Sequence, residues 1–128
     1  MNAVSVPTKP VIPFQWGLPS DSAARKQRPI VTGFLDYFPA AAAGVAFVSW
    51  AGNQKHNPGQ PLHWARGKSA DQEDCIGRHI LERGGVEYLE TADAIYEIPH
   101  ELALAWRAMA NAQLAAEAHG APVARGAK

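Results

Sequence analysis

Disulfide-forming cysteines, net charge and long apolar runs are all missing from this sequence, and each absence excludes a class of protein. Cys75 is the only cysteine, so the chain cannot form an internal disulfide, which fits a reducing compartment better than a secreted scaffold. Twelve Lys and Arg balance twelve Asp and Glu, so no overall charge favours a nucleic acid polymer or an anionic membrane. No stretch approaches about eighteen consecutive apolar residues, and prolines interrupt the N-terminal segment where a signal peptide is continuously apolar. We therefore expect a cytoplasmic protein without a membrane partner.

Several motifs that would identify a reaction are missing as well. The triplet Gly67-Lys68-Ser69 ends like a Walker loop, but Leu62 stands where that loop requires a glycine. The sequence also contains no HExxH and no GxSxG motif, and one cysteine alone cannot make a zinc site. Any chemistry must therefore come from residues that are dispersed along the chain.

The length of 128 residues predicts a single domain with two flanking segments. Residues 1–29 contain five prolines and are predicted to form an extended arm, because each proline removes a backbone donor and fixes its own φ. This arm is too apolar for a solvated tail, so we expect it to lie along its own domain or along a neighbouring subunit. Residues 30–120 are the predicted helical domain, and residues 121–128 are a predicted frayed tail.

Three principal helices are predicted, so the expected fold class is all-α. The first is a buried helix over residues 39–52, with Pro39 in its first turn and Gly52 as its stop. The second runs from about residue 70 to residue 83, and the third runs from Pro99 towards Gly120. Residues 30–38 are either a short extended piece or a helical turn, and residues 86–98 are either a short helix or an irregular connection.

A long polar loop over residues 53–69 separates the first two helices and combines cationic, amide and aromatic side chains. Such a mixture suits a nucleotide, because cations attract phosphates, amides pair with base edges and an indole offers a stacking face. The residues expected to contact a nucleotide in this loop are Asn53, Lys55, His56, Asn57, Trp64, Arg66 and Lys68.

The second helix carries a polar stripe. At about 100° per residue, Asp71, Cys75, Arg78 and Glu82 fall within roughly 60° of one another, with Asp74 about 60° to one side. One interpretation is a solvated face with internal ion pairs. The other is that Asp71 and Asp74, one turn apart, bind a hard divalent cation at a phosphate site.

The third helix carries a second polar line, in which His100, Arg107 and Asn111 fall within about 40°. It is either a wetted face or the continuation of the nucleotide site. In the second case His100 would lie at a helix N-terminus that attracts anions, and Arg107 and Asn111 would extend towards a base or sugar.

The elements HNPG, HWARGKS and RH, followed by H-x4-AWRA, resemble the small phage and prophage proteins described as dATP/dGTP diphosphohydrolases. These are relatives of the MazG-type all-α nucleotide pyrophosphohydrolases, and the resemblance covers about residues 28 to 117. It implies an oligomeric protein, a dimer or tetramer, that binds a nucleoside triphosphate and Mg²⁺ in the host cytoplasm. MazG-type proteins hold metal with an ExxE and an ExxD pair, and here only Asp71-x-x-Asp74 resembles one of these pairs.

The leading hypothesis is therefore a Mg²⁺-dependent pyrophosphohydrolase-like protein for purine deoxynucleoside triphosphates. Asp71 and Asp74, helped by Glu73 or Glu101, would bind the cation. The basic residues expected to neutralise phosphate charge are Lys55, Arg66, Lys68 and Arg78, and the expected proton carriers are His79 and His100. The alternatives are a phage protein that binds a nucleotide or nucleotide-derived signal without catalysis, and a structural helical assembly protein.

Overall fold

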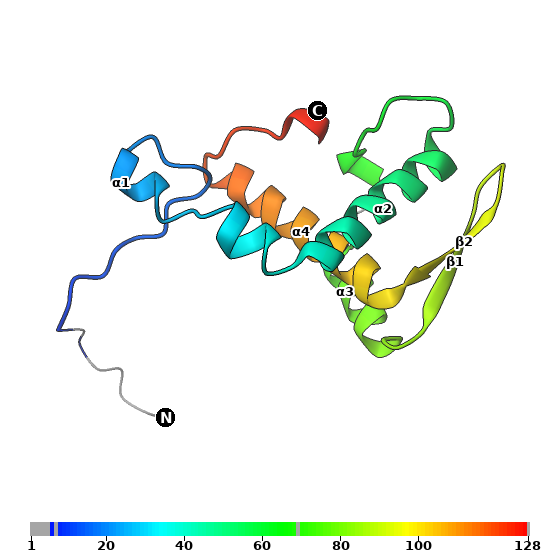
Figure 1. Ribbon diagram of the computed structural model, residues 1–128, viewed down its shortest axis with the longest axis horizontal. Coiled ribbons are helices and arrows are strands. Elements are labelled where there is room, and N and C mark those ends of the chain that lie inside the picture. Colours follow the sequence, from blue (N-terminus) through cyan, green and yellow to red (C-terminus); the bar gives the residue numbers. More distant parts are fainter. Residues whose placement is uncertain (1–5, 7, 69, 128) are drawn as a thin grey trace.

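The computed structural model describes residue 6, residues 8–68 and residues 70–127, and at Lys68 it describes the backbone alone. The chain is mixed α/β, so the predicted all-α class is wrong: a two-stranded antiparallel sheet follows α3 (Gln72–Leu81) and precedes α4 (His100–Ala118) along the chain, and it projects at one side of the molecule (Figure 1). In chain order the elements are α1 (Ser22–Arg25), the π-helical turn η1 (Val31–Leu35), α2 (Pro39–His56), the 3₁₀ turn η2 (Arg66–Lys68), α3 (Gln72–Leu81), β1 (Val86–Glu90), β2 (Ile95–Pro99), α4 (His100–Ala118) and the 3₁₀ turn η3 (Arg125–Ala127).

The sheet is a β-hairpin formed by the residues that the sequence left open between helix and irregular connection. Glu87 pairs with Ile98 and Leu89 pairs with Tyr96 in the ladder. The β-branched and aromatic residues of both strands favour this conformation. Thr91 organises the turn, because its hydroxyl oxygen accepts hydrogen bonds from two turn amides while its own N–H donates to the Ala94 carbonyl at 2.8 Å.

Helix α2 begins at Pro39 as predicted but ends one turn later than Gly52. Asn57 precedes Pro58, and a residue before proline is disfavoured in helical conformation, so the helix stops there instead. The expectation that this helix is buried is wrong within a single copy of the chain. Ala51 is fully buried, but the large aromatic side chains of Phe47 and Trp50 remain 39% and 42% exposed.

Helices α3 and α4 agree with the sequence prediction except at their ends. Helix α3 begins and ends about two residues inside the predicted range, and Gly84 follows it with a φ of +88° that stops the helix. Helix α4 begins at His100, directly after Pro99, and Gly120 follows its end with a φ of +99°.

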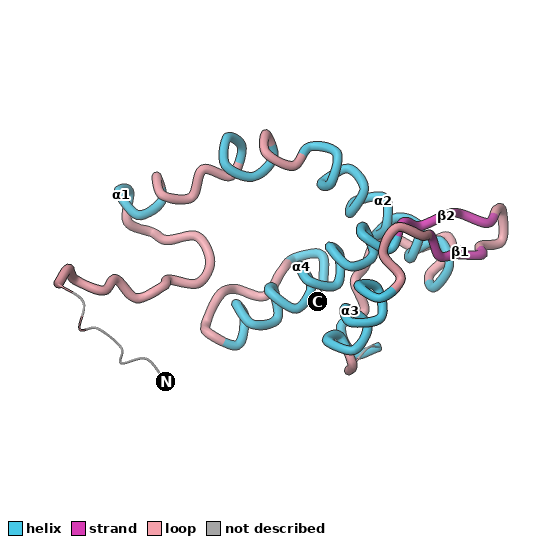
Figure 2. The backbone as a smooth tube through the Cα atoms, turned by 90° about the horizontal axis from the view of Figure 1, so that it is seen from below, coloured by secondary structure: helices cyan, strands magenta, loops and turns pink. Residues whose placement is uncertain are grey.

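The packing is centred on a small core of Ala51, Ile98 and Ala103. Helices α2 and α4 approach closely, because a Cβ placed on Gly44 would lie 2.6 Å from both methyl carbons of Leu102. The hairpin projects at one end of the molecule and the N-terminal arm projects at the other, as Figures 1 and 2 both show. Within the described residues, the helices are too short or too polar to cross a lipid bilayer.

Both flanking segments contact the end of α4. Trp16 stacks on His119 with ring centroids 4.7 Å apart, and Pro19 is fully buried, so the later half of the arm lies on its own domain. Val11, Ile12 and the residues around them remain exposed. Within the segment 121–128 that was predicted to fray, Arg125–Ala127 instead form η3 and Ala127 is 2% exposed, while Lys128 lies outside the described residues.

Candidate functional site

A polar cleft of about 500 Å³ lies between the C-terminal half of α2, the polar loop, α3, β1 and α4. It collects residues from segments that are far apart in the sequence, and six of them were predicted from sequence as site residues. Those six are Asn53, His56, Asn57, Trp64, His79 and Arg107. Four polar residues that the sequence reasoning missed line the same cleft, namely Ser49, His63, Gln72 and Glu87.

The last turns of α2 form one wall of the cleft. Asn53 is buried, and its side-chain amide donates to the carbonyl of Gln60 at 3.0 Å. Its Oδ1 accepts from the side chain of Asn57 at 3.4 Å. These bonds fix the start of the polar loop against the helix, so part of the amide capacity predicted for base recognition has a structural role.

Arg107 provides the positive charge of the cleft. Its Nη1 donates to Oε1 of the buried Gln72 at 3.2 Å, and its guanidinium lies 5.7 Å from the ring centre of Trp106. Gln72 is the first residue of α3 and Arg107 lies in α4, so the packing of these two helices positions the guanidinium.

A second, apolar groove of about 340 Å³ adjoins the polar cleft. The two share Ser49, His63, Trp64 and Trp106 as lining residues. The two indole rings meet edge to face with centroids 5.8 Å apart, and Trp106 donates its ring N–H to the Ser49 hydroxyl at 2.8 Å. A ligand that is flat and apolar at one end and anionic at the other would match the two hollows together.

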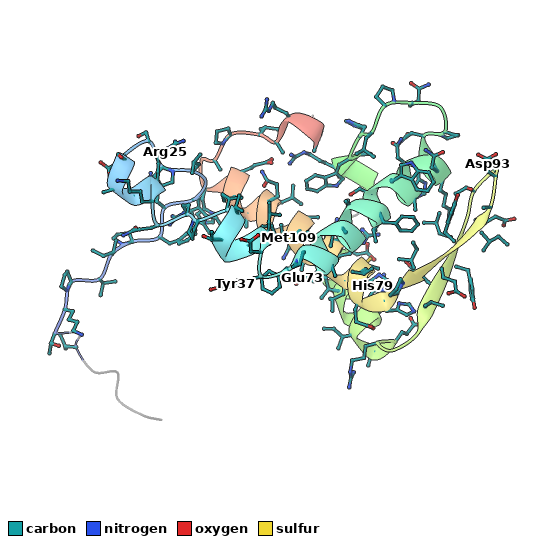
Figure 3. The ribbon with its side chains drawn as sticks, viewed as in Figure 1. Arg25, Tyr37, Glu73, His79, Asp93 and Met109 are labelled. Carbon is teal, nitrogen blue, oxygen red and sulfur yellow. The ribbon has the colours of Figure 1, made fainter. Side chains whose placement is uncertain are left out.

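A His–Glu–His cluster lies at the edge of the polar cleft. The ligating atoms of His79, Glu87 and His100 all lie within 4.8 Å of one another. The Nδ1 atoms of the two histidines are 2.9 Å apart. Figure 3 shows His79 where α3, the hairpin and the start of α4 meet, whereas Asp93 lies at the far tip of the hairpin.

The local fold explains how this cluster forms. The turn after α3 is closed by the amide of His100, which donates to the carbonyl of Gly85 at 3.1 Å and so returns the chain to α3. Glu101, predicted as a metal ligand, accepts from the amide of Gly84 at 2.7 Å and stabilises the same turn. Glu87 lies on the face of the hairpin that carries Ile98, because directly paired residues share a face.

Burial of the His79 side chain is the largest cause that lowers its pKa. The carboxylate of Glu87 opposes this shift, while the charges of His100 and Arg107 add to it, and Glu82 weakly opposes it. A lowered pKa favours the neutral imidazole at neutral pH, which is the form that donates a lone pair.

The acidic residues predicted to bind Mg²⁺ lie elsewhere on α3. Asp71 pairs with Arg78 at 3.1 Å, and both side chains are more than half exposed. Glu73 and Asp74 are exposed and do not line the cleft. Among the described residues, no three of Asp71, Glu73, Asp74 and Glu101 bring carboxylate oxygens within 4.8 Å of one another. The arrangement of Asp71 and Arg78 matches the solvated stripe that was the alternative interpretation.

The basic residues predicted to bind phosphate are similarly dispersed. Both outer nitrogens of Arg66 donate to the carboxylate of Glu117, and the Arg66 guanidinium covers one face of Trp64 at 4.6 Å. The hydrogen bond from Arg66 is the main reason that the pKa of Glu117 falls to about 2. Lys55 and Asn111 are exposed and do not line the cleft, and the side chain of Lys68 lies outside the described part of the structure.

Comparisons of the chain with models of protein families, with curated proteins and with solved structures found no match.

Proposed function

We propose that the chain binds a purine deoxynucleoside triphosphate across the two adjoining hollows and hydrolyses it to a monophosphate and pyrophosphate. The observation that carries the proposal is the convergence of six predicted site residues, drawn from α2, the polar loop, α3 and α4, on one cleft. The resemblance to the dATP/dGTP diphosphohydrolases supports the same ligand class.

The two hollows suit the two ends of a nucleotide. The base would lie in the apolar groove against the exposed parts of Trp64 and Trp106, since aromatic side chains stack with bases regardless of their identity. The phosphates would lie in the polar cleft, where Arg107 can donate several hydrogen bonds to their oxygens. Because Arg66 already covers one face of Trp64, a base would use the other face or the edge of that ring.

The proposed reaction is the attack of water on the α-phosphorus. A new bond forms between the water oxygen and phosphorus, the bond to the α–β bridging oxygen breaks, and the electron pair leaves with pyrophosphate. The proton lost by the water passes to solvent. A divalent cation would polarise the phosphoryl oxygen, and Arg107 would stabilise the charge that develops on the phosphates.

Nucleotide capture without hydrolysis is the second candidate. It is favoured by the positions of Asp71 and Glu101, which bond to Arg78 and to a backbone amide instead of forming a carboxylate cage. For both candidates we propose a cytoplasmic protein whose partner is a nucleotide. The proposed assembly is a homo-oligomer.

Titration of the full chain with dATP and dGTP, followed by tryptophan fluorescence and calorimetry, tests the binding step. Arg107→Gln should weaken binding by about tenfold to a hundredfold, because hydrogen bonds to charged groups contribute about 1.5–3 kcal/mol. Arg83→Gln is the matched control, because Arg83 is exposed and lies outside the cleft. Equal affinities of the two variants for dATP and dGTP would refute the assigned site. Nucleotide that stays intact during incubation with divalent cations would refute hydrolysis and support capture.

A further inference from the structure

We propose that His79, Glu87 and His100 bind one divalent cation of the zinc class, a borderline transition metal rather than Mg²⁺. The inference deepens the proposed function by assigning the metal of the same cleft. Only the role of the cation in hydrolysis rests on that function, because metal binding itself can be measured without a nucleotide.

The donor atoms favour this class of metal. Two imidazole nitrogens and one carboxylate oxygen suit Zn²⁺, Mn²⁺, Fe²⁺, Co²⁺ and Ni²⁺. Mg²⁺ prefers oxygen ligands in octahedral geometry and retains several waters. The two histidines therefore decide against the cation that the sequence pattern of acidic residues predicted.

The separations fit a single ion. Ligands about 2.1 Å from a tetrahedral centre lie about 3.4 Å from one another. The two Nδ1 atoms are 2.9 Å apart and share a hydrogen bond, so a bound ion would replace this bond and move the two atoms apart by about 0.5 Å. One ligand atom from each of the three residues lies within 4.8 Å of the other two. Glu87 is exposed, so its carboxylate can move the remaining distance, at most about 1.4 Å, by rotating about its side-chain bonds.

The support behind His100 also matches a metal ligand. His100 is 5% exposed, and its second ring nitrogen faces the carboxylate of Glu82 at 3.6 Å. Histidines that bind metals commonly direct their other ring nitrogen to a carboxylate, which fixes the tautomer and increases the basicity of the ligating nitrogen. Glu82 is thus a positioning residue in this proposal.

The site is of the catalytic kind, with three protein ligands and an open side. His79 and Glu87 line the polar cleft, so a fourth ligand would come from the cleft. A cation of the zinc class lowers the pKa of a bound water to near 7, which would supply the nucleophile for hydrolysis. The three ligands come from α3, β1 and the start of α4, which are elements of regular structure and hold a site more precisely than loops do.

The decisive experiment uses the untagged full chain, treated with a chelator and then titrated with Zn²⁺, Co²⁺, Mn²⁺ and Mg²⁺ in separate calorimetric runs. We expect one Zn²⁺ or Co²⁺ per chain, and the visible spectrum of bound Co²⁺ should report imidazole ligands in a four-coordinate site. Glu82→Gln should weaken binding by about 10–100-fold, as expected for a residue that orients a ligand. Glu87→Gln and His79→Gln should weaken it further.

Matched controls separate the site from general effects. Glu97→Gln changes a carboxylate of the same hairpin outside the cluster, and His119→Gln changes a histidine that stacks on Trp16, so both should bind Co²⁺ like the parent chain. Because His100 is buried and its replacement would disturb the packing around it, the test rests on the exposed Glu87 and the half-buried His79. Absence of stoichiometric Zn²⁺ and Co²⁺ binding, or equal affinity in Glu87→Gln and Glu97→Gln, would overturn the proposal.

The two proposals fail in different ways. Metal binding that disappears in Glu87→Gln, without any nucleotide turnover, would retain this site and refute hydrolysis. Turnover that needs Mg²⁺, survives Glu87→Gln and disappears in the double variant Asp71→Ala and Asp74→Ala would refute this site and retain hydrolysis.

Discussion

The chain exposes far more surface than a monomer of its mass, which predicts that a second copy covers part of it. Its accessible surface is 9716 Å², whereas a folded monomer of 13.8 kDa exposes about 6,600 Å². The difference of about 3,000 Å² per chain exceeds the roughly 800 Å² per partner of a standard interface, and covering even half of it in a dimer would bury about 3,000 Å² in total, within the range of obligate oligomers. We therefore expect a dimer or larger homo-oligomer.

The distribution of apolar side chains indicates which face is covered. Helix α2 is apolar around most of its circumference, which is typical of a helix that is buried on all sides, yet its own chain covers only one side. Next to it is a group of exposed side chains that we call the η1 patch. The η1 patch consists of Ile30, Val31, Phe34, Leu35, Tyr37 and Phe38.

Phe38→Glu tests whether the η1 patch is the interface. Phe38 is 51% exposed, so about 100 Å² of its surface would leave water on association, which corresponds to at most about 2.5 kcal/mol per copy. In a two-fold dimer both copies lose this contribution, about 5 kcal/mol together, so the dissociation constant should rise by up to about three to four orders of magnitude. Sedimentation equilibrium over a series of concentrations measures the change directly.

Leu81→Glu is the matched control, because Leu81 is 82% exposed and lies at the end of α3, away from the η1 patch. It should leave the mass distribution unchanged. A parent chain that is monomeric at micromolar concentration, with helix content intact by circular dichroism, would refute the reasoning from surface area. An oligomer that resists Phe38→Glu would show that another face is covered.

Three further predictions concern stability and can be measured by urea denaturation of the full chain. Gly44→Ala should destabilise the chain, because overpacking against Leu102 costs about 1–3 kcal/mol and outweighs a helix-propensity gain of about 1 kcal/mol. Adding Leu102→Ala should remove this overpacking, so the effects of the two substitutions on the free energy of unfolding should not be additive; additive effects would contradict the contact. Glu117 has a pKa lowered from 4.5 to about 2, so its stabilising effect is fully present above pH 4.5 and is lost as pH falls towards 2; Glu117→Gln should lack this part of the acid sensitivity, and an unchanged pH profile would contradict the pairing. Thr91→Ala should cost about 1 kcal/mol through loss of its turn hydrogen bonds, whereas an unchanged midpoint would show that the turn does not need the hydroxyl.

The long helices could be predicted because their signals are local. Pro39 and Pro99 mark starts, and Gly84 and Gly120 mark stops whose positive φ values only glycine adopts easily. Gly52 was a misleading signal, since a glycine inside a helix costs about 1 kcal/mol but does not end it. The end of α2 is instead set by Asn57, because a residue before a proline is disfavoured in helical conformation.

The hairpin could not be predicted in the same way because its local sequence signals are weak. Its strands are five residues each, and the turn between them has no Asn-Gly or Asp-Gly pair of the kind that identifies a tight hairpin. Its stability comes from Ile98, which is 1% exposed, and from Leu89 packed against the same core. Those contacts involve α2 and α4, so they cannot be read from the local sequence.

The composition of the cleft was predicted better than its chemistry. Spacing along one helix predicted that Asp71 and Arg78 share one polar stripe, but the ion pairs it suggested for Arg78 were with Asp74 and Glu82, whereas the pair in the structure is with Asp71. Spacing could not show that Arg66 is held by Glu117, fifty-one residues away. The partner of a charged side chain depends on tertiary packing, so a list of charged residues does not establish which charges a ligand can use.

The register of the hairpin decides whether the cluster exists. Glu87 lies beside His79 and His100 because it shares a face with Leu89, and the burial of Leu89 and Ile98 fixes that face towards the core. A slip of one residue would turn Glu87 away and expose both apolar side chains, so the same burial that stabilises the sheet also orients the carboxylate. In a helix over residues 86–98, side chains would share a face every 3.6 residues instead of every two, so Glu87 and Leu89 would not lie on the same face. The element that the sequence left open is therefore the one that brings a carboxylate to the two histidines.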